Sequence, residues 1–330
     1  MSRRRRGGRG SGTPRTADPR SVSTGASTLE IDWSVNATGE DDLRAAAVQL
    51  NSNEDKDRNL EAADRLTRAA AADGAELVVL PEKFNVLGTT EDYERGAEPL
   101  DGPTIGWARA TARELEIDLV PGSFPERREG REKLCNTSVH IGPDGDVRAV
   151  YRKIHMFDVE VGGQVFRESA AEEPGDEIVL SRTDAGLALG LTVCYDLRFP
   201  ELYRILAVRG ARVVTLPAAF TKVTGHAHWD ILIRARAIEN QAFMVAAGQI
   251  GPHRPDRETY GGSVIVDPWG EVLARAPDAV DGPRAETFVA ADLNLERQDE
   301  VREKLPSLAN RVATAYRWPA AAPLPEEARL

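Results

Sequence analysis

The stretch "GLTVCYDLRFPELY" (residues 190–203) decides the fold. Residues 186–193 are small or branched apolar residues, which predict a buried strand that ends at Cys194. Pro200 suits the first turn of a helix that runs through Arg209, and Gly210 suits the position after its end. The stretch therefore predicts a strand, a polar turn and a helix, with a thiol at the turn.

Strands and helices alternate on both sides of this stretch. The expected strands cover 43–50, 76–82, 117–123, two segments within 136–155, 212–217, 242–248, a hairpin over 261–275, and 287–293. One expected helix begins after an N-cap at Asn53 or Asp55. Two further helices are expected over 104–116 and 228–241. This order predicts an α/β fold in one domain over residues 42–311, with two sheets packed face to face inside helical layers.

The two ends of the chain differ from this domain. Residues 1–41 are rich in Arg, Gly and Ser and predict a disordered tail, and residues 312–330 predict a C-terminal tail. The net charge of −11 argues against nucleic acid as a partner. No apolar run predicts a membrane-spanning helix. Two cysteines do not make a disulfide framework, so we expect a cytoplasmic protein.

Three chemically useful residues follow predicted strands. Glu82 follows "LVVLP", Lys153 ends "VRAVYRK" and Cys194 ends "GLALGLTVC". In α/β sheets, sites gather beyond the carboxyl ends of strands. A carboxylate there can move the thiol proton, an ammonium can stabilise an oxyanion, and a thiol can attack a carbonyl. Taken singly, the same residues also fit a helix-capping glutamate, a solvated lysine and a buried cysteine.

The sequence motifs around these residues resemble those of a known family. "LVVLPEKF", "YRKIHMFD" and "LTVCYDLRFPEL" resemble the glutamate, lysine and cysteine motifs of the nitrilase or carbon–nitrogen hydrolase superfamily, in that order. "AHWDILIRARAIENQ" and "GGSVIVDPWGEVLA" extend the likeness over residues 43–306. The resemblance implies a four-layer α–β–β–α sandwich, a catalytic triad of Glu82, Lys153 and Cys194, no metal or organic cofactor, and homodimers or larger homo-oligomers.

The resemblance also implies a second glutamate and a mechanism. The family carries this glutamate in a word like "FQES", so we expect Glu168 in "VFRES", with Glu160 as the rival. The enzyme would be an amidase that attacks a small amide through Cys194, forms a thioester and releases ammonia. Lys153 and the backbone N–H of Tyr195 would hold the oxyanion.

Several words most resemble the amidase branch that contains deaminated-glutathione amidase and ω-amidase, whose substrates carry carboxylates. Arg198 or Lys222 would then read the substrate carboxylate. Arg198 alternatively pairs with Glu201 or Asp196 for a structural purpose. The expected pocket-wall residues are Phe220, Thr221 and His228.

Two departures from the family pattern weaken the substrate assignment. Gly262 replaces a histidine of the relatives, and Cys135 replaces a tyrosine. We expect both changes to touch the pocket and interpret Cys135 as a structural thiol.

Competing interpretations stay open at this point. His226 and His228 form an H-x-H pair, but the sequence offers too few further ligands for a metal site. A papain-like hydrolase would use one of these histidines as its base. Within the family, an N-carbamoyl amino acid amidohydrolase or a nitrilase is an alternative, and a catalytically inactive interaction protein on the same fold is another.

Overall fold

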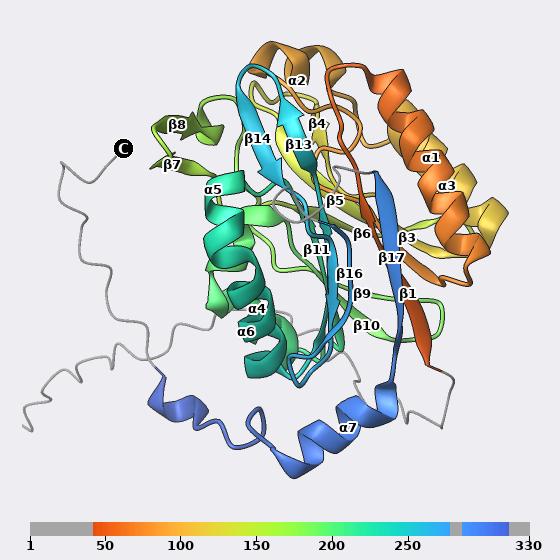
Figure 1. Cartoon of the computed structure of the whole chain (residues 1–330), viewed down its shortest axis with the longest axis vertical. Coiled ribbons are helices and arrows are strands. Elements are labelled where there is room, and N and C mark those ends of the chain that lie inside the picture. The colour runs from red at the N-terminus through yellow and green to blue at the C-terminus, as the bar shows by residue number, and fades with distance from the viewer. Residues whose placement is uncertain (1–41, 278–285, 317–330) are drawn as a thin grey trace, which may run out of the picture. The chain divides into compact units, whose positions relative to one another are not determined.

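The computed structural model describes residues 42–277 and 286–316, and its strands form two mixed sheets and two small hairpins (Figure 1). The seven-stranded sheet has the order β17-β1-β2-β3-β5-β4, with β6 paired to β5. Its strands are β1 (Leu43–Gln49), β2 (Leu77–Val79), β3 (Asp118–Val120), β4 (Phe124–Glu126), β5 (Cys135–Ile141), β6 (Val147–Arg152) and β17 (Thr287–Leu293).

The six-stranded sheet has the order β16-β15-β12-β11-β10-β9. Its strands are β9 (Leu180–Arg182), β10 (Ala188–Leu191), β11 (Val213–Ala218), β12 (Phe243–Gly248), β15 (Val264–Val266) and β16 (Val272–Arg275). The two hairpins are β7 (Asp158–Val161) with β8 (Gln164–Arg167), and β13 (Ile250–His253) with β14 (Arg257–Tyr260).

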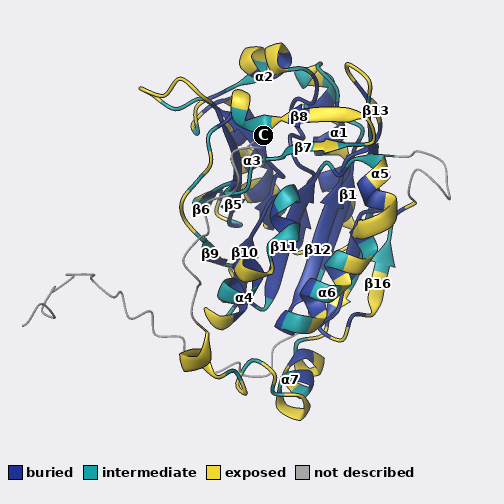
Figure 2. Cartoon of the chain, turned by 90° about the vertical axis from the view of Figure 1, so that its left-hand side faces the viewer, coloured by how far each residue is buried: buried dark blue, intermediate teal, exposed yellow. Residues whose placement is uncertain are grey.

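Helices cover the outer face of each sheet. The α-helices are α1 (Lys56–Ala72), α2 (Thr90–Gly96), α3 (Pro103–Leu115), α4 (Pro200–Val208), α5 (Lys222–Thr224), α6 (Asp230–Asn240) and α7 (Leu295–Lys304). Four short turns are η1 (Glu168–Ala170), η2 (Cys194–Arg198), the π-helical η3 (Gly225–Trp229) and η4 (Ala313–Ala315). α1 and α3 pack on the seven-stranded sheet, and α4 and α6 on the six-stranded sheet (Figures 1 and 2).

The alternation of side chains along β1 explains how four layers form. Successive residues of a strand point to opposite faces of its sheet. Ala45 and Ala47 belong to the core between the two sheets, whereas Ala46 and Val48 belong to the core beneath α1 and α3. Because both faces of β1 are buried, the strand is apolar almost throughout. The α–β–β–α sandwich expected from the resemblance is thus confirmed.

Most expected elements are present with shifted ends. Asp55 caps α1, since its side chain accepts a hydrogen bond from the Arg58 N–H. The expected strand 76–82 is shorter, and the helix expected to start at residue 228 begins at Lys222 and passes through the π-helical turn η3. The expected elements do not include α2 or the two hairpins.

The predicted tail 1–41 and residues 317–330 of the predicted C-terminal tail lie outside the described residues. Within the described residues, no helix combines the length and apolar character that crossing a membrane requires.

The core between the sheets predicts a stability difference between a buried and an exposed truncation to alanine. Leu189 of β10 is fully buried there, whereas Val208 of α4 is 50% exposed. Leu189→Ala should lower the free energy of unfolding by about 2–5 kcal/mol because it leaves a cavity. Val208→Ala should change it by less than about 0.5 kcal/mol. Urea unfolding followed by circular dichroism measures both, and equal losses would contradict this packing.

Candidate active site

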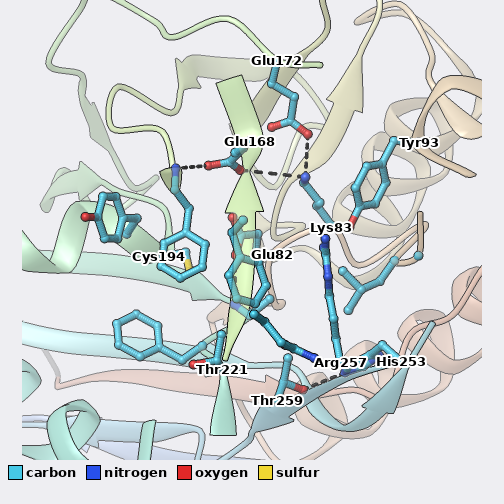
Figure 3. Close-up of a pocket in the computed structure, with 18 of the residues that line it drawn as sticks. Glu82, Lys83, Tyr93, Glu168, Glu172, Cys194, Thr221, His253, Arg257 and Thr259 are labelled. Atoms are coloured by element: carbon cyan, nitrogen blue, oxygen red, sulfur yellow. Dashed lines mark hydrogen bonds and ion pairs between the residues drawn. The ribbon is translucent and has the colours of Figure 1, made fainter. Parts of the chain in front are cut away.

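Glu82, Lys153 and Cys194 lie just beyond the ends of β2, β6 and β10, and all three line one cavity (Figure 3). β2 and β6 belong to one sheet and β10 to the other. The face-to-face packing of the sheets therefore brings together three residues that are far apart in the sequence. Each side chain is buried, and Cys194 is the most exposed at 7%.

Lys153 sits at the centre of this group. Its Nζ lies 3.1 Å from Glu82 Oε1, 2.9 Å from Glu168 Oε1 and 2.8 Å from Glu168 Oε2. An ammonium has three N–H donors. Each donor of Lys153 therefore has a carboxylate oxygen, so the side chain is saturated in this arrangement.

Glu82 is fixed through both carboxylate oxygens. Oε1 also accepts a hydrogen bond from Asn136 Nδ2 at 2.8 Å, and Oε2 accepts one from the Ala219 N–H at 2.9 Å. The Cys194 thiol lines the same cavity, close enough for the Glu82 charge to raise the pKa of the thiol. Glu82 is thus bound to Lys153 and lies near the thiol, in the position of a base for it.

Glu168 begins η1 and, besides Lys153, binds the Phe157 N–H through Oε2 at 2.7 Å. It lines the cavity. The rival Glu160 is exposed on β7 and does not line the cavity. The geometry therefore supports Glu168, and not Glu160, as the second glutamate.

The backbone at Cys194 is left-handed, with φ of 49°. A left-handed conformation is unfavourable for a residue with a side chain, so the surroundings must hold it. The Asp196 carboxylate accepts hydrogen bonds from the Val193 N–H at 2.8 Å, the Tyr151 hydroxyl at 2.6 Å and His155 Nδ1 at 2.7 Å. This buried carboxylate fixes the turn that presents the thiol.

Burial and charge shift the ionisation of the group. Burial raises the pKa of the Cys194 thiol well above its usual range, and the neighbouring Glu82 charge raises it further. Burial alone would lower the pKa of Lys153, but the charges of Glu168 and Glu82 outweigh it and hold that pKa well above its usual value. The resting site therefore holds a protonated thiol next to an ammonium.

Three of the expected substrate-binding residues line the cavity: Arg198, Phe220 and Thr221. The Arg198 guanidinium lies 5.3 Å from the ring centre of Phe220 and donates a hydrogen bond to His228 Nδ1 at 3.3 Å. Neither expected structural partner is paired with Arg198, since the oxygens of Asp196 are occupied as described and no ion pair joins Arg198 to Glu201 among the described residues.

The expectation for His228 was wrong. His228 is exposed and does not line the cavity. His228 lies on the π-helical turn η3, where the sequence predicted the start of a regular helix. His226 is exposed on the same turn, so neither histidine is placed as a base for Cys194. Lys222 is also absent from the cavity wall and pairs with Glu258 at 3.1 Å.

Cys135 and Gly262 do not line the cavity either, contrary to expectation. Adjacent residues of a strand face opposite sides, so Asn136 reaches Glu82 while the Cys135 thiol lies 3.6 Å from the carbonyl of Glu173. The Gly262 carbonyl accepts a hydrogen bond from the indole of Trp229 at 2.8 Å.

Sequence reasoning missed four cavity-lining side chains of particular chemical interest. These are Lys83, Tyr93, Glu172 and Arg257. The one available signal was the position of Lys83 directly after Glu82. In the described ranges, no cluster of three or more histidine, cysteine or acidic side chains could hold a metal ion.

The chain is similar to known hydrolases along most of its length. A family model described as carbon-nitrogen hydrolase matches residues 44–303. The deaminated glutathione amidase of Synechocystis sp. is 40% identical over 271 residues, which cover 81% of this chain and 97% of that protein. The omega-amidase of Mus musculus is 39% identical over 278 residues, which cover 83% and 96%.

The chain is also similar to solved structures. The C. elegans NitFhit protein superposes with a TM-score of 0.76 at 35% identity, over 84% of this chain and 67% of that chain. A mutant amidase from Nesterenkonia sp. AN1 superposes with a TM-score of 0.65 at 28% identity, over 83% and 95%, and carries the acetamide moiety of fluoroacetamide on its active-site cysteine.

The Asp196 network predicts a graded loss. Asp196→Asn replaces an acceptor of several buried hydrogen bonds and should lower the free energy of unfolding by about 1–3 kcal/mol. The matched variant Tyr151→Phe removes a single hydroxyl donor and should cost about 1 kcal/mol. Chemical denaturation of both variants tests the network. An Asp196→Asn protein as stable as the unmodified chain would contradict it.

Proposed function

The chain belongs to the carbon-nitrogen hydrolase family, and on that premise we propose that it hydrolyses a small amide bearing a carboxylate, releasing ammonia through a thioester on Cys194. The observation that carries the proposal is the meeting of Glu82, Lys153 and Cys194 at one cavity. Its base, its cation and its nucleophile are the groups that this reaction requires.

In the first half of the reaction, Glu82 takes the proton of the Cys194 thiol as the sulfur attacks the amide carbonyl carbon. The carbonyl oxygen becomes an oxyanion, held by the Lys153 ammonium and the backbone N–H of Tyr195. When the oxyanion collapses, the C–N bond breaks. Glu82 gives its proton to the departing nitrogen, so ammonia leaves and the acyl group remains on sulfur as a thioester.

In the second half, Glu82 takes a proton from water as its oxygen attacks the thioester carbon. A second oxyanion forms on the same donors and collapses with cleavage of the C–S bond. The acid product leaves, and the sulfur recovers its proton from Glu82. The high pKa of the Cys194 thiol favours that return and keeps the resting sulfur protonated until a substrate arrives.

The cavity wall supports an anionic substrate. Four arginines line the cavity: Arg254 pairs with Glu54, whereas no ion pair with a carboxylate is found among the described residues for Arg167, Arg198 or Arg257. We assign the carboxylate to Arg198 because it lies on the same turn as Cys194, and a guanidinium binds a carboxylate through two hydrogen bonds. The ring of Phe220 makes a cation–π contact with this guanidinium.

The names of the relatives suggest which amides to test. The proposed substrates are ω-amides of 2-oxo acids and deaminated glutathione, with N-carbamoyl amino acids and simple nitriles as the alternatives within the family. An ammonia-release screen over these four classes separates them. A protein that folds but turns over none of them supports the inactive interaction protein instead.

The homodimer and the cytoplasmic location remain predictions. Ile231 and Ile238 of α6 are 69% and 46% exposed, which offers an apolar face to a second copy. Light scattering during size-exclusion chromatography tests the assembly.

Cys194→Ala should abolish ammonia release while the circular dichroism spectrum and the melting temperature stay close to those of the unmodified chain. The same substitution at Cys135 is the matched control, because that thiol is buried away from the cavity. Retained turnover in Cys194→Ala would refute the nucleophile.

Arg198→Gln should raise KM for a carboxylate-bearing amide by about tenfold to a hundredfold, since it removes a charged hydrogen-bonding partner. It should leave kcat/KM for an uncharged aliphatic amide within about threefold, because the reacting groups are untouched. Steady-state kinetics with both amides measures the difference. If Arg257→Gln raised this KM more than Arg198→Gln does, the substrate carboxylate would bind at β14 instead.

A further inference from the structure

A second buried lysine lies beside the proposed catalytic group. Lys83 Nζ is 2.5 Å from Glu172 Oε1 and 3.8 Å from Glu168 Oε1, and it lies 3.9 Å from the ring centre of Tyr93 (Figure 3). Lys83 is 6% exposed and Glu172 is 2% exposed, and both line the cavity. The mechanism described above uses neither residue.

The backbone of Lys83 is held in an unfavourable conformation. Its φ is 51°, in the left-handed region that suits glycine. Two side chains fix this segment: Ser123 Oγ accepts from the Lys83 N–H at 3.0 Å, and Gln249 Nε2 donates to the Glu82 carbonyl at 3.0 Å. As a result the consecutive side chains of Glu82 and Lys83 both reach the cavity wall.

Stability alone does not explain the pair. Desolvating two charges offsets most of their attraction, so a buried ion pair stabilises a fold no better than apolar side chains that pack well. Glu172 Oε2 is moreover buried without a hydrogen-bond partner among the described residues. The pair is therefore a costly arrangement in a strained segment, next to the reacting groups.

Both lysines lie near the same carboxylate oxygen of Glu168, Oε1. Lys153 lies 2.9 Å from Oε1 and Lys83 lies 3.8 Å from it, while Oε2 keeps the Phe157 N–H. All three donors of Lys153 are engaged at rest. Stabilising an oxyanion therefore requires Lys153 to withdraw a donor from Glu82 or from Glu168.

We propose that Lys83 is a positioning residue that takes over Glu168 Oε1 when Lys153 turns a donor toward the oxyanion. Resting on the proposed function, this role keeps the Glu168 carboxylate paired and in place through both halves of the reaction. Glu172 holds Lys83 ready in the resting state, and Tyr93 covers the ammonium with its ring face. In this role Lys83 acts on Glu168 and not on the substrate or the sulfur.

Lys83→Met tests this role, since methionine keeps a flexible stem and removes the charge. We expect kcat to fall by about tenfold to a hundredfold with KM within about threefold, because the loss is confined to the transition state. In a Glu168→Gln background, the same substitution should lower kcat by no more than about threefold, because its partner carboxylate is gone.

Glu172→Gln separates the charge of Lys83 from the ion pair. It breaks the Lys83–Glu172 pair but leaves Lys83 charged, so its loss in kcat should be at least about tenfold smaller than that of Lys83→Met. Equal losses in the two variants would show that only the buried pair matters and would overturn the proposal.

The remaining outcomes are also decisive, with circular dichroism and thermal melting checking that each variant is folded. A kcat of Lys83→Met within about threefold of the unmodified chain overturns the role of Lys83 but leaves Cys194 and the proposed function intact. If Lys83→Met lowers kcat by the same factor in the unmodified chain and in the Glu168→Gln background, the coupling to Glu168 is overturned. Turnover by Cys194→Ala overturns the proposed function itself.

Discussion

The site depends on one buried ammonium. Lys153 is 2% exposed and has three carboxylate oxygens around Nζ at 2.8–3.1 Å. A charge removed from water persists only when it is paired and hydrogen-bonded, so Lys153 requires both Glu82 and Glu168. Those carboxylates in turn need further donors, which Asn136, Ala219 and Phe157 supply. The need to pair the Lys153 charge therefore fixes the positions of the loops that carry these residues.

Backbone strain accompanies the same constraint. Lys83 and Cys194 are both left-handed, with φ of 51° and 49°, and they flank the buried charges from the two sheets. Hydrogen bonds to Ser123 and Asp196 hold these conformations. Strained residues of this kind persist where the surrounding structure fixes them, and they cluster at sites that bind or react. The two sheets provide that rigid support.

The sequence predicts the strands that lead to Glu82 and Cys194, because β2 and β10 are buried on both faces and therefore strongly apolar. Lys153 instead follows β6, which is only partly buried and mixes polar with apolar residues. The meeting of these three residues could not be derived from spacing, since it depends on two sheets packing face to face. The resemblance to a family supplied that step and also pointed to Glu168.

Other parts could not be predicted, for identifiable reasons. Lys83 and Glu172 are 89 residues apart, and a polar pair at that separation leaves no periodic signal. The β13–β14 hairpin, which brings Arg257 to the cavity, contains two prolines and reads as a loop. The π-helical turn η3, on which His228 lies, leaves no signal in a 3.6-residue periodicity.

Trapping the acyl-enzyme tests the central claim most directly. The chain is mixed with an amide that it hydrolyses, quenched in acid within a turnover and measured by intact-protein and peptide mass spectrometry. The account predicts a mass increase equal to the acyl group, carried by the peptide that contains Cys194 and removed by hydroxylamine. Turnover without an adduct under conditions where ammonia is released in a burst, or an adduct on another residue, would contradict it.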